Sequence, residues 1–158
     1  MIRLARTSWG NLPIFPSMYL LDTNVVSELR KAKSNRADPH VMQWAEEVPV
    51  DGLFVCSITI FELELGILLM ERRDPVQGAA LRQWLQHSVL PTFAGRLLDV
   101  DTAVALRCAR LHVPEHRSDR DAFIAATALV HGLTVATRNV ADFVGTGVPL
   151  LNPWSGSP

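Results

Sequence analysis

Residues 19–31 read YLLDTNVVSELRK, and this stretch decides the fold class. A short apolar run, Tyr19 to Leu21, is stopped by Asp22, and a helical pattern then continues to about Lys31. The same unit, a short apolar strand followed by an amphipathic helix, recurs along the rest of the chain. Strands that alternate with helices of about ten or more residues indicate a parallel sheet with helices on both faces. We therefore expect an α/β fold.

The remaining elements follow from the same periodicity. Further strands are predicted at residues 53–56, 96–98, 133–136 and 148–151. Further helices are predicted at residues 39–47, 59–72, 76–88, 102–112 and 121–131. We expect a single domain over residues 18–154, a short tail at 155–158, and an irregular proline-containing extension at 1–17.

The charge balance limits how the chain can attract nucleic acid. The formal net charge of the 158 residues is −1, so any such binding must come from local basic patches. Two candidate patches, which could equally be solvated helix faces, are Arg30, Lys31, Lys33 and Arg36, and Arg107, Arg110, Arg117 and Arg120.

Cysteine usage and hydropathy indicate a cytoplasmic protein. Cys56 and Cys108 each lie in an apolar run, and we interpret them as buried free thiols in a reducing compartment. No apolar run approaches the roughly 18 residues that cross a membrane, so no membrane partner is expected.

Carboxylates fall where the predicted strands pass into helices. Asp22 follows the first strand, and Glu62 lies in the first turn of the helix after the second strand. Asp121 opens the alanine-rich helix, and Asp142 follows the strand that ends at Ala136. In parallel sheets, function gathers at this carboxyl edge.

Helix capping is the alternative explanation for each acid taken alone. Three pairs place a capping residue three positions before an acid, and either Asp22 or Thr23 could cap the first helix alone. The three pairs are Thr59 with Glu62, Ser118 with Asp121, and Asn139 with Asp142.

The set as a whole favours a metal site. Several negative charges brought to one edge of a sheet repel one another unless a cation neutralises them. Carboxylates suit the hard cations Mg²⁺ and Mn²⁺, which activate water and bind a phosphodiester. The histidines are scattered, and none pairs at a spacing that suggests zinc. Asp119 has only a weak case for a direct role, and we interpret it as a cap or an outlying charge.

Four motifs in order resemble PIN-domain proteins, and specifically the FitB-like branch of the VapC toxins. They are Leu20-Leu21-Asp22-Thr23-Asn24-Val25, Ser57-Ile58-Thr59-Ile60-Phe61-Glu62-Leu63 with Gly66, Asp121-Ala122-Phe123-Ile124-Ala125-Ala126-Thr127-Ala128, and Thr137-Arg138-Asn139-Val140-Ala141-Asp142-Phe143. The ending Leu151-Asn152-Pro153-Trp154 is also similar, so the match runs from Met18 to Trp154.

The resemblance implies a three-layer α/β/α sandwich around a parallel sheet of about five strands. It implies a Mg²⁺- or Mn²⁺-dependent endoribonuclease that is the toxin of a type II toxin–antitoxin pair, forms homodimers and meets operator DNA only through its antitoxin. By motif, Asp22, Glu62 and Asp121 would bind the metal. Asp142 would complete the site, directly or through water. Asn24 and Thr137 would be polar supports.

Two other functions are consistent with parts of the sequence. In a non-catalytic partner module the acids would only cap helices, and the chain would work by binding an antitoxin-like protein that itself contacts operator DNA. An aspartate-nucleophile phosphatase would require a second acid two residues after Asp22, where the chain has Asn24, so we set this function aside.

Overall fold

The computed structural model describes residues 17–156. The predicted extension at 1–17 lies outside the described residues except for Ser17, as do the last two residues of the predicted tail.

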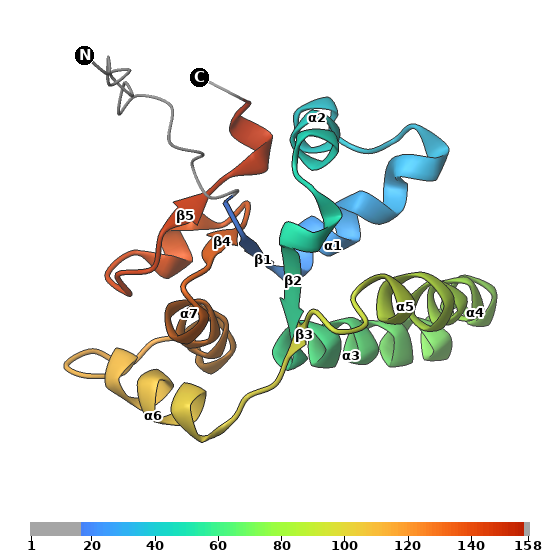
Figure 1. The fold of residues 1–158 in the computed structure, drawn as a ribbon. Helices are drawn as coiled ribbons and strands as arrows, with labels where there is room; N and C mark the ends of the chain where they lie inside the picture. Colours follow the sequence, from blue (N-terminus) through green and yellow to red (C-terminus); the bar gives the residue numbers. More distant parts are fainter. Residues whose placement is uncertain (1–16, 157–158) are drawn as a thin grey trace, which may run out of the picture.

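A parallel sheet of five strands forms the centre of the molecule (Figure 1), as predicted. The strands are β1 (Tyr19–Leu21), β2 (Leu53–Cys56), β3 (Leu97–Leu98), β4 (Thr134–Ala136) and β5 (Leu150–Leu151). Their order is β3-β2-β1-β4-β5, and every pairing is parallel. Leu20 pairs with Phe54 on one side and Val135 on the other, so β1 is the central strand.

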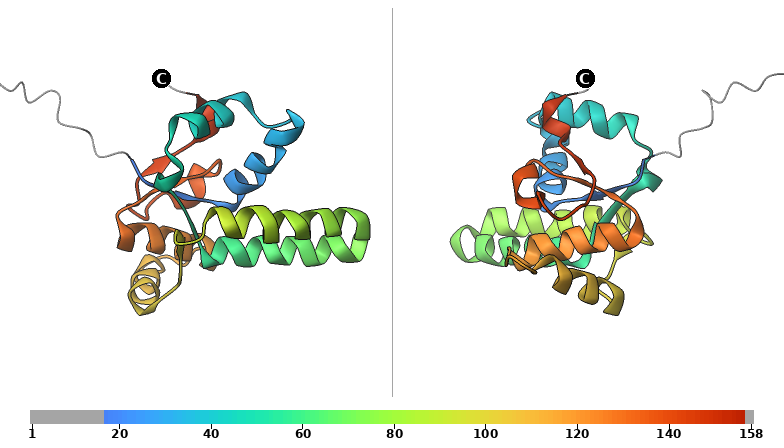
Figure 2. Two further views of the ribbon diagram at one scale, coloured as in Figure 1. Left: turned by 45° about the vertical axis from the view of Figure 1, so that its right-hand side comes forward. Right: turned by 90° about the vertical axis from the view of Figure 1, so that its left-hand side faces the viewer.

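Helices cover both faces of the sheet (Figure 2). The α-helices are α1 (Thr23–Arg30), α2 (Pro39–Glu47), α3 (Ser57–Arg73), α4 (Pro75–Trp84), α5 (Leu90–Thr92), α6 (Thr102–Leu111) and α7 (Asp119–His131). The shorter helical segments are η2 (Lys31–Ser34), η3 (Val50–Gly52), η4 (Leu85–Val89), η5 (Val140–Phe143) and η6 (Pro153–Ser155).

Alternating side chains of the strands divide the core into two layers. Leu21 is fully buried in a cluster with Val25 of α1 and Ile67 of α3, and the adjacent Leu20 is buried in a second cluster with Ile124 of α7. Successive side chains of a strand point to opposite faces of the sheet, so Leu20 and Leu21 pack in core layers on opposite faces of the sheet. This division gives the three-layer α/β/α sandwich that the motifs implied.

Helices α3 and α4 pack side by side as a long hairpin that extends beyond the sheet (Figure 2). Gly78 of α4 allows the close approach, since a Cβ there would lie 2.6 Å from the Cα of Glu71 on α3. Arg82 of α4 forms ion pairs with Glu64 and Glu71 of α3. The hairpin is thus held by close backbone packing and by one arginine shared between two acids.

Several predicted boundaries and caps are wrong. Helix α3 begins at Ser57, directly after β2, so Thr59 lies inside the helix, and its hydroxyl donates to the carbonyl of Leu21 instead of capping. Ser118 and Asn139 stand at the N-cap positions of α7 and η5, but neither makes a side-chain cap bond.

The helix predicted at 76–88 is part of a continuous helical run from α4 through the π-helical η4 to α5. Within the described part of the chain, no helix is both long and apolar enough to span a bilayer.

Candidate active site

The four predicted acids lie around the carboxyl end of β1. The strand order reverses beside β1, because β2 and β3 lie on one side of it and β4 and β5 on the other, and ligands bind at such a point in open α/β sheets. Asp22 follows β1 directly, and Glu62 is the sixth residue of α3, one turn later than the sequence pattern suggested. Asp121 lies in the first turn of α7, and Asp142 lies in η5. We call these four residues the acid cluster.

Asp22 is the most buried member, with 7% of its surface exposed. Its Oδ1 atom accepts the backbone N–H of Thr23 at 2.8 Å, so Asp22 caps α1. Its Oδ2 atom accepts the hydroxyl of Thr137 at 2.7 Å and the side-chain amide of Asn24 at 3.3 Å. The structure therefore places both predicted polar supports on this carboxylate. A carboxylate offers about four acceptor positions, so Oδ1 keeps one free for a cation.

Glu62 is half-buried and lies between a hydroxyl and a guanidinium. Its Oε1 atom accepts the hydroxyl of Thr23 at 3.0 Å, and its Oε2 atom lies 3.8 Å from Nη1 of Arg120. Sequence reasoning missed both neighbours. Thr23 could have been suspected from its place beside Asp22. Arg120 was named only in a candidate basic patch, and its proximity to Glu62 depends on the packing of α7 against α3.

Burial is the largest cause that raises the pKa of Asp22, Glu62 and Asp121 above ordinary values. The neighbouring negative charges raise these values further: Asp142 acts on Asp22 and on Asp121, and Asp22 acts on Glu62 and on Asp121. The hydrogen bond from Thr137 opposes the rise at Asp22. Asp22, Glu62 and Asp121 therefore each lie close enough to another acid for its negative charge to disfavour their ionised forms.

The acid cluster offers a cation only carboxylate oxygens, which are the donors that Mg²⁺ and Mn²⁺ prefer. No three of its carboxylates have oxygens within 4.8 Å of one another. Arg120 is the one cation within ion-pair distance of any of the four among residues 17–156, so the protein itself neutralises little of the charge of the acid cluster. The donor chemistry fits a hard divalent cation, and the carboxylates must close around it.

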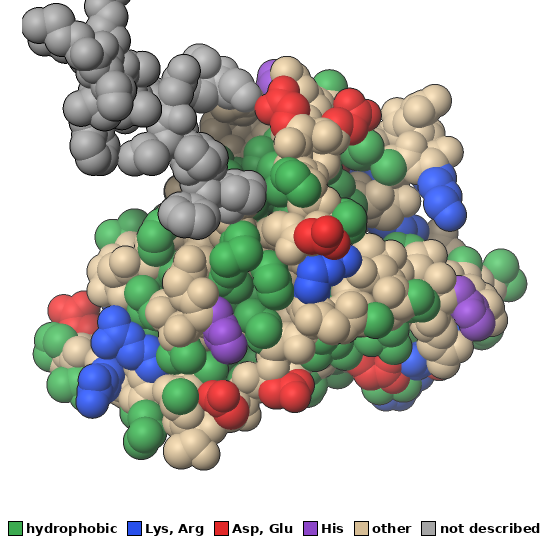
Figure 3. Space-filling view, in the orientation of Figure 1, with side chains coloured by type: hydrophobic (Ala, Val, Ile, Leu, Met, Phe, Trp, Pro, Cys, Tyr) green, Lys and Arg blue, Asp and Glu red, His purple; other side chains and the backbone are tan. Residues whose placement is uncertain are grey.

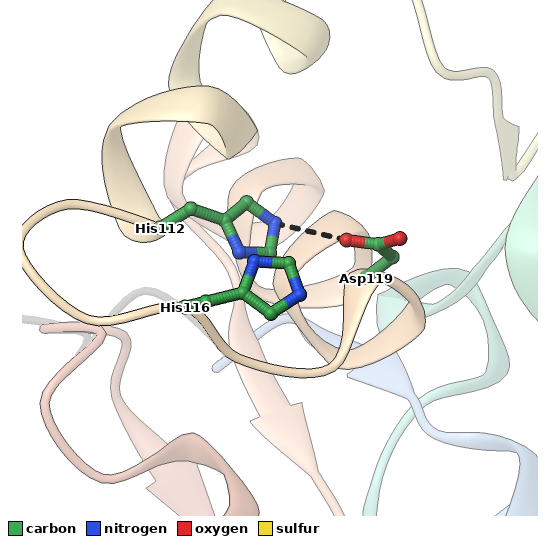
Figure 4. Close-up of side chains that lie close together, drawn as sticks. All are labelled: His112, His116 and Asp119. Carbon is green, nitrogen blue, oxygen red and sulfur yellow. Dashed lines mark ion pairs between the residues drawn. The ribbon is translucent and has the colours of Figure 1, made fainter.

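A second cluster does bring three potential ligand atoms within 4.8 Å: His112, His116 and Asp119 (Figure 4). The two imidazole rings stack with centroids 4.6 Å apart. No histidine pair was predicted from the sequence, because these two histidines come together only through the turn that follows α6. Asp119, the first residue of α7, faces His112 and not the acid cluster.

Hydrogen bonding argues against a metal at this second cluster. Nδ1 of His112 accepts the backbone N–H of Arg117 at 3.3 Å, so the neutral ring carries its proton on Nε2. That Nε2 atom lies 3.3 Å from Asp119. A metal-binding histidine uses an unprotonated nitrogen and donates from its other one, which is the reverse pattern. We interpret the cluster as a hydrogen-bonded tie between α6 and α7.

Comparison with known proteins decides the family. The model of the PIN domain matches residues 19–143, a range that contains the whole acid cluster. The chain belongs to the PIN-domain family. The resemblance inferred from the four sequence motifs is thereby confirmed.

Curated relatives cover most of this PIN domain. Plasmid stability protein StbB of Pseudomonas syringae pv. tomato is 38% identical over 145 residues, which are 87% of this chain and 99% of that protein. Toxin FitB of Neisseria gonorrhoeae is 37% identical over 142 residues, with coverage of 87% and 99%. VapC ribonuclease Y4jK of Sinorhizobium fredii is 37% identical over 145 residues, with coverage of 87% and 98%.

Solved structures agree with this PIN fold. FitAcB from Neisseria gonorrhoeae superposes with a TM-score of 0.78 at 35% identity, covering 87% of this chain and 99% of that chain. FitAB bound to an IR36 DNA fragment gives a TM-score of 0.77 at 33% identity, covering 87% and 96%. The predicted fold class is confirmed.

Proposed function

We propose that this PIN domain is a metal-dependent endoribonuclease and the toxin of a type II toxin–antitoxin pair. One observation carries the proposal: acids from four separate segments gather at the carboxyl end of β1, where burial and neighbouring negative charge raise the pKa values of Asp22, Glu62 and Asp121. A divalent cation would stabilise a site of this kind by neutralising its negative charge, and the carboxylates would hold the cation at the end of β1. The names of the relatives, a VapC ribonuclease and the toxin FitB among them, support the same activity.

Asp22, Glu62 and Asp121 hold the cation in this proposal, and Asp142 completes the site directly or through water. When bound, Mg²⁺ or Mn²⁺ lowers the pKa of a water molecule and neutralises charge on the phosphodiester. Thr137 and Asn24 hold Asp22 in one orientation by donating hydrogen bonds to its Oδ2 atom. Thr23 fixes Glu62 in the same way.

The proposal includes protein partners. The similar structures contain FitAB bound to DNA and VapBC complexes, so we propose a cognate antitoxin and operator DNA reached through that antitoxin. The homodimer that the motif resemblance implied is also part of the proposal. Helix α3 offers apolar surface for such contacts: Phe61, Leu68 and Leu69 are 50%, 47% and 57% exposed. Exposed apolar side chains grouped on one element are typical of interaction surfaces.

Replacement of Asp22 by Asn tests the activity. Asp22→Asn keeps the size of the side chain and its ability to cap α1, but removes the charge. We expect RNA cleavage in Mg²⁺ to fall by at least about 100-fold, with little change in melting temperature. Asp101→Asn is the matched control, because Asp101 also caps a helix, accepting the N–H of Val104 at 2.9 Å. Cleavage by Asp22→Asn at the parent rate, in a stable protein, contradicts the proposal.

Metal titration separates the enzyme from a non-catalytic module that only binds an antitoxin. A cation bound by the folded state alone raises the melting temperature in proportion to the logarithm of its concentration above the dissociation constant. We expect Mg²⁺ or Mn²⁺ to stabilise the parent and to have no such effect on Asp121→Asn. An equal response of the two proteins favours the module.

A further inference from the structure

Three arginines, two beside the acid cluster and one farther along α1, each lie over an aromatic ring. Arg120 lies over Phe61 at 5.0 Å, Arg138 over Trp154 at 5.3 Å and Arg30 over Trp84 at 5.8 Å from the ring centroid. The side chains of all three arginines are exposed. A cation–ring contact restrains a guanidinium in position and leaves N–H donors free for another partner.

The three arginines approach the cluster from different elements. Arg120, at the start of α7, lies 3.8 Å from Glu62. Arg138 follows β4, and its backbone N–H donates to Asn24, the residue whose amide reaches Asp22. Its ring partner Trp154 packs against the core cluster of α1 and α3, so this arginine is anchored to the body of the fold.

Arg30 lies at the far end of a groove that begins at the acids. Thr23, Ser27 and Arg30 are spaced i, i+4 and i+7, so they share one face of α1. They line a groove of about 220 Å³ with Glu62 and Gly66 of α3, and the rest of its lining is apolar: Leu63, Ile67, Leu81 and Trp84. Thr23 and Arg30 are about 10 Å apart along the helix axis. The groove thus connects a carboxylate of the acid cluster to an exposed arginine.

Gly66 keeps this groove open. A Cβ at Gly66 would meet nothing within 4 Å, so packing does not require glycine here. Glycine in a helix interior costs about 0.5–1 kcal/mol relative to alanine. Its effect on the structure is to leave space beside Glu62, in the wall of the groove.

We propose that an RNA strand lies in the α1–α3 groove and is held through its phosphates by Arg30, Arg120 and Arg138. The chain has a net charge of −1, and its acid cluster repels a polyanion, so local cations must supply the attraction. On the face drawn in Figure 3, acidic and basic side chains are scattered among apolar ones and form no broad basic area. Guanidinium groups bind phosphate through paired donors. This inference rests on the proposed ribonuclease function.

Binding of a fluorescein-labelled single-stranded RNA oligomer of mixed sequence, followed by anisotropy in EDTA, tests the arginines without cleavage. We expect Arg30→Ala, Arg120→Ala and Arg138→Ala each to raise the Kd about tenfold, as for one lost charge-assisted hydrogen bond. The slope of log Kd against log salt concentration should fall by about 0.7 for each. Arg72→Ala and Arg110→Ala, exposed arginines on other surfaces of α3 and α6, are the controls and should match the parent.

Gly66→Leu tests the groove without changing charge. We expect it to weaken RNA binding severalfold relative to Gly66→Ala while the melting temperature stays at or above that of the parent. A further variant replaces Arg30, Arg120 and Arg138 together by Ala. If this triple variant and Gly66→Leu both bind RNA with the Kd and salt slope of the parent, the proposal is overturned, and a protein partner becomes the better candidate for the groove. If the arginine variants lose RNA binding but Asp22→Asn cleaves RNA at the parent rate, the acid cluster is not the ribonuclease site, whereas the proposed RNA-binding site is supported.

Discussion

Asp22 shows that capping and participation in a site are not alternatives. From the sequence, helix capping and a role in a metal site were alternative explanations for each acid. In the structure the two oxygens of Asp22 divide the tasks, since Oδ1 caps α1 and Oδ2 receives Thr137 and Asn24. The same hydrogen bonds that begin a helix orient the carboxylate at the end of β1. A capping pattern in sequence therefore carries little weight against a functional role when several such acids converge.

Asp121 should destabilise the metal-free protein. Its pKa is raised, first by burial and then by Asp22 and Asp142, so the folded state holds the proton more tightly than the unfolded state. The stability that this group contributes is therefore lost as pH rises through its raised pKa. In EDTA at neutral pH, we expect Asp121→Asn to increase the free energy of unfolding by a few tenths to about 1 kcal/mol.

Urea unfolding of the parent and of Asp121→Asn, each at neutral pH and near pH 4, measures this effect. The gain from Asp121→Asn should shrink at the lower pH, because the raised pKa of Asp121 favours uptake of a proton by the parent carboxyl there. A variant that is less stable than the parent at neutral pH in EDTA would show that charge repulsion is not the dominant effect at Asp121.

Glu28 has the opposite pH dependence. A hydrogen bond from Lys31 is the largest cause that lowers its pKa, and the backbone N–H of Asp38 adds a second donor. A lowered pKa means that the stabilisation is complete above the ordinary value and is lost as pH falls through the folded value. We expect Glu28→Gln to cost about 1–2 kcal/mol at pH 7. The cost should fade in acid unfolding curves near pH 3, and a cost independent of pH would exclude the ionic explanation.

Periodicity located every strand of the sheet and the starts of α2 and α6, but not the starts of α3 and α7. β2 passes into α3 without a loop, so the apparent capping residue Thr59 is already in the first turn. The predicted helix at 76–88 continues to Thr92 because the π-helical η4 carries the chain on to α5. Strand positions follow from short buried apolar runs, whereas helix ends depend on contacts with other elements, which a local pattern does not contain.

Two helical glycines should respond in opposite ways to alanine. A Cβ at Gly78 would lie 2.6 Å from the Cα of Glu71, whereas one at Gly66 meets nothing within 4 Å. We expect Gly78→Ala to lower the free energy of unfolding by about 1–3 kcal/mol, because α3 and α4 must separate. Gly66→Ala should raise it by about 0.5–1 kcal/mol through helix propensity. Thermal or urea unfolding measures both, and effects of the same sign would contradict the packing described for the hairpin.

At the scale of the whole molecule, sequence reasoning predicted which edge of the sheet carries the acids but not how they are spaced. The edge follows from the strands being parallel, and all pairings in the order β3-β2-β1-β4-β5 are parallel. Contacts between distant segments could not be predicted from sequence. They are Arg120 beside Glu62, Arg138 over Trp154, and His112 paired with Asp119. These depend on how α7 and the final turn pack, which no local spacing reveals.

We propose that acids distant in sequence meet at the end of β1 and share a divalent cation. Anomalous diffraction from a crystal soaked in Mn²⁺ is the decisive experiment, because the scattering identifies and locates the ion. We expect a manganese peak between Asp22 and Asp121, with carboxylate oxygens at about 2.0–2.2 Å. A crystal with no peak among the acids, or with manganese only beside His112 and His116, would contradict the account.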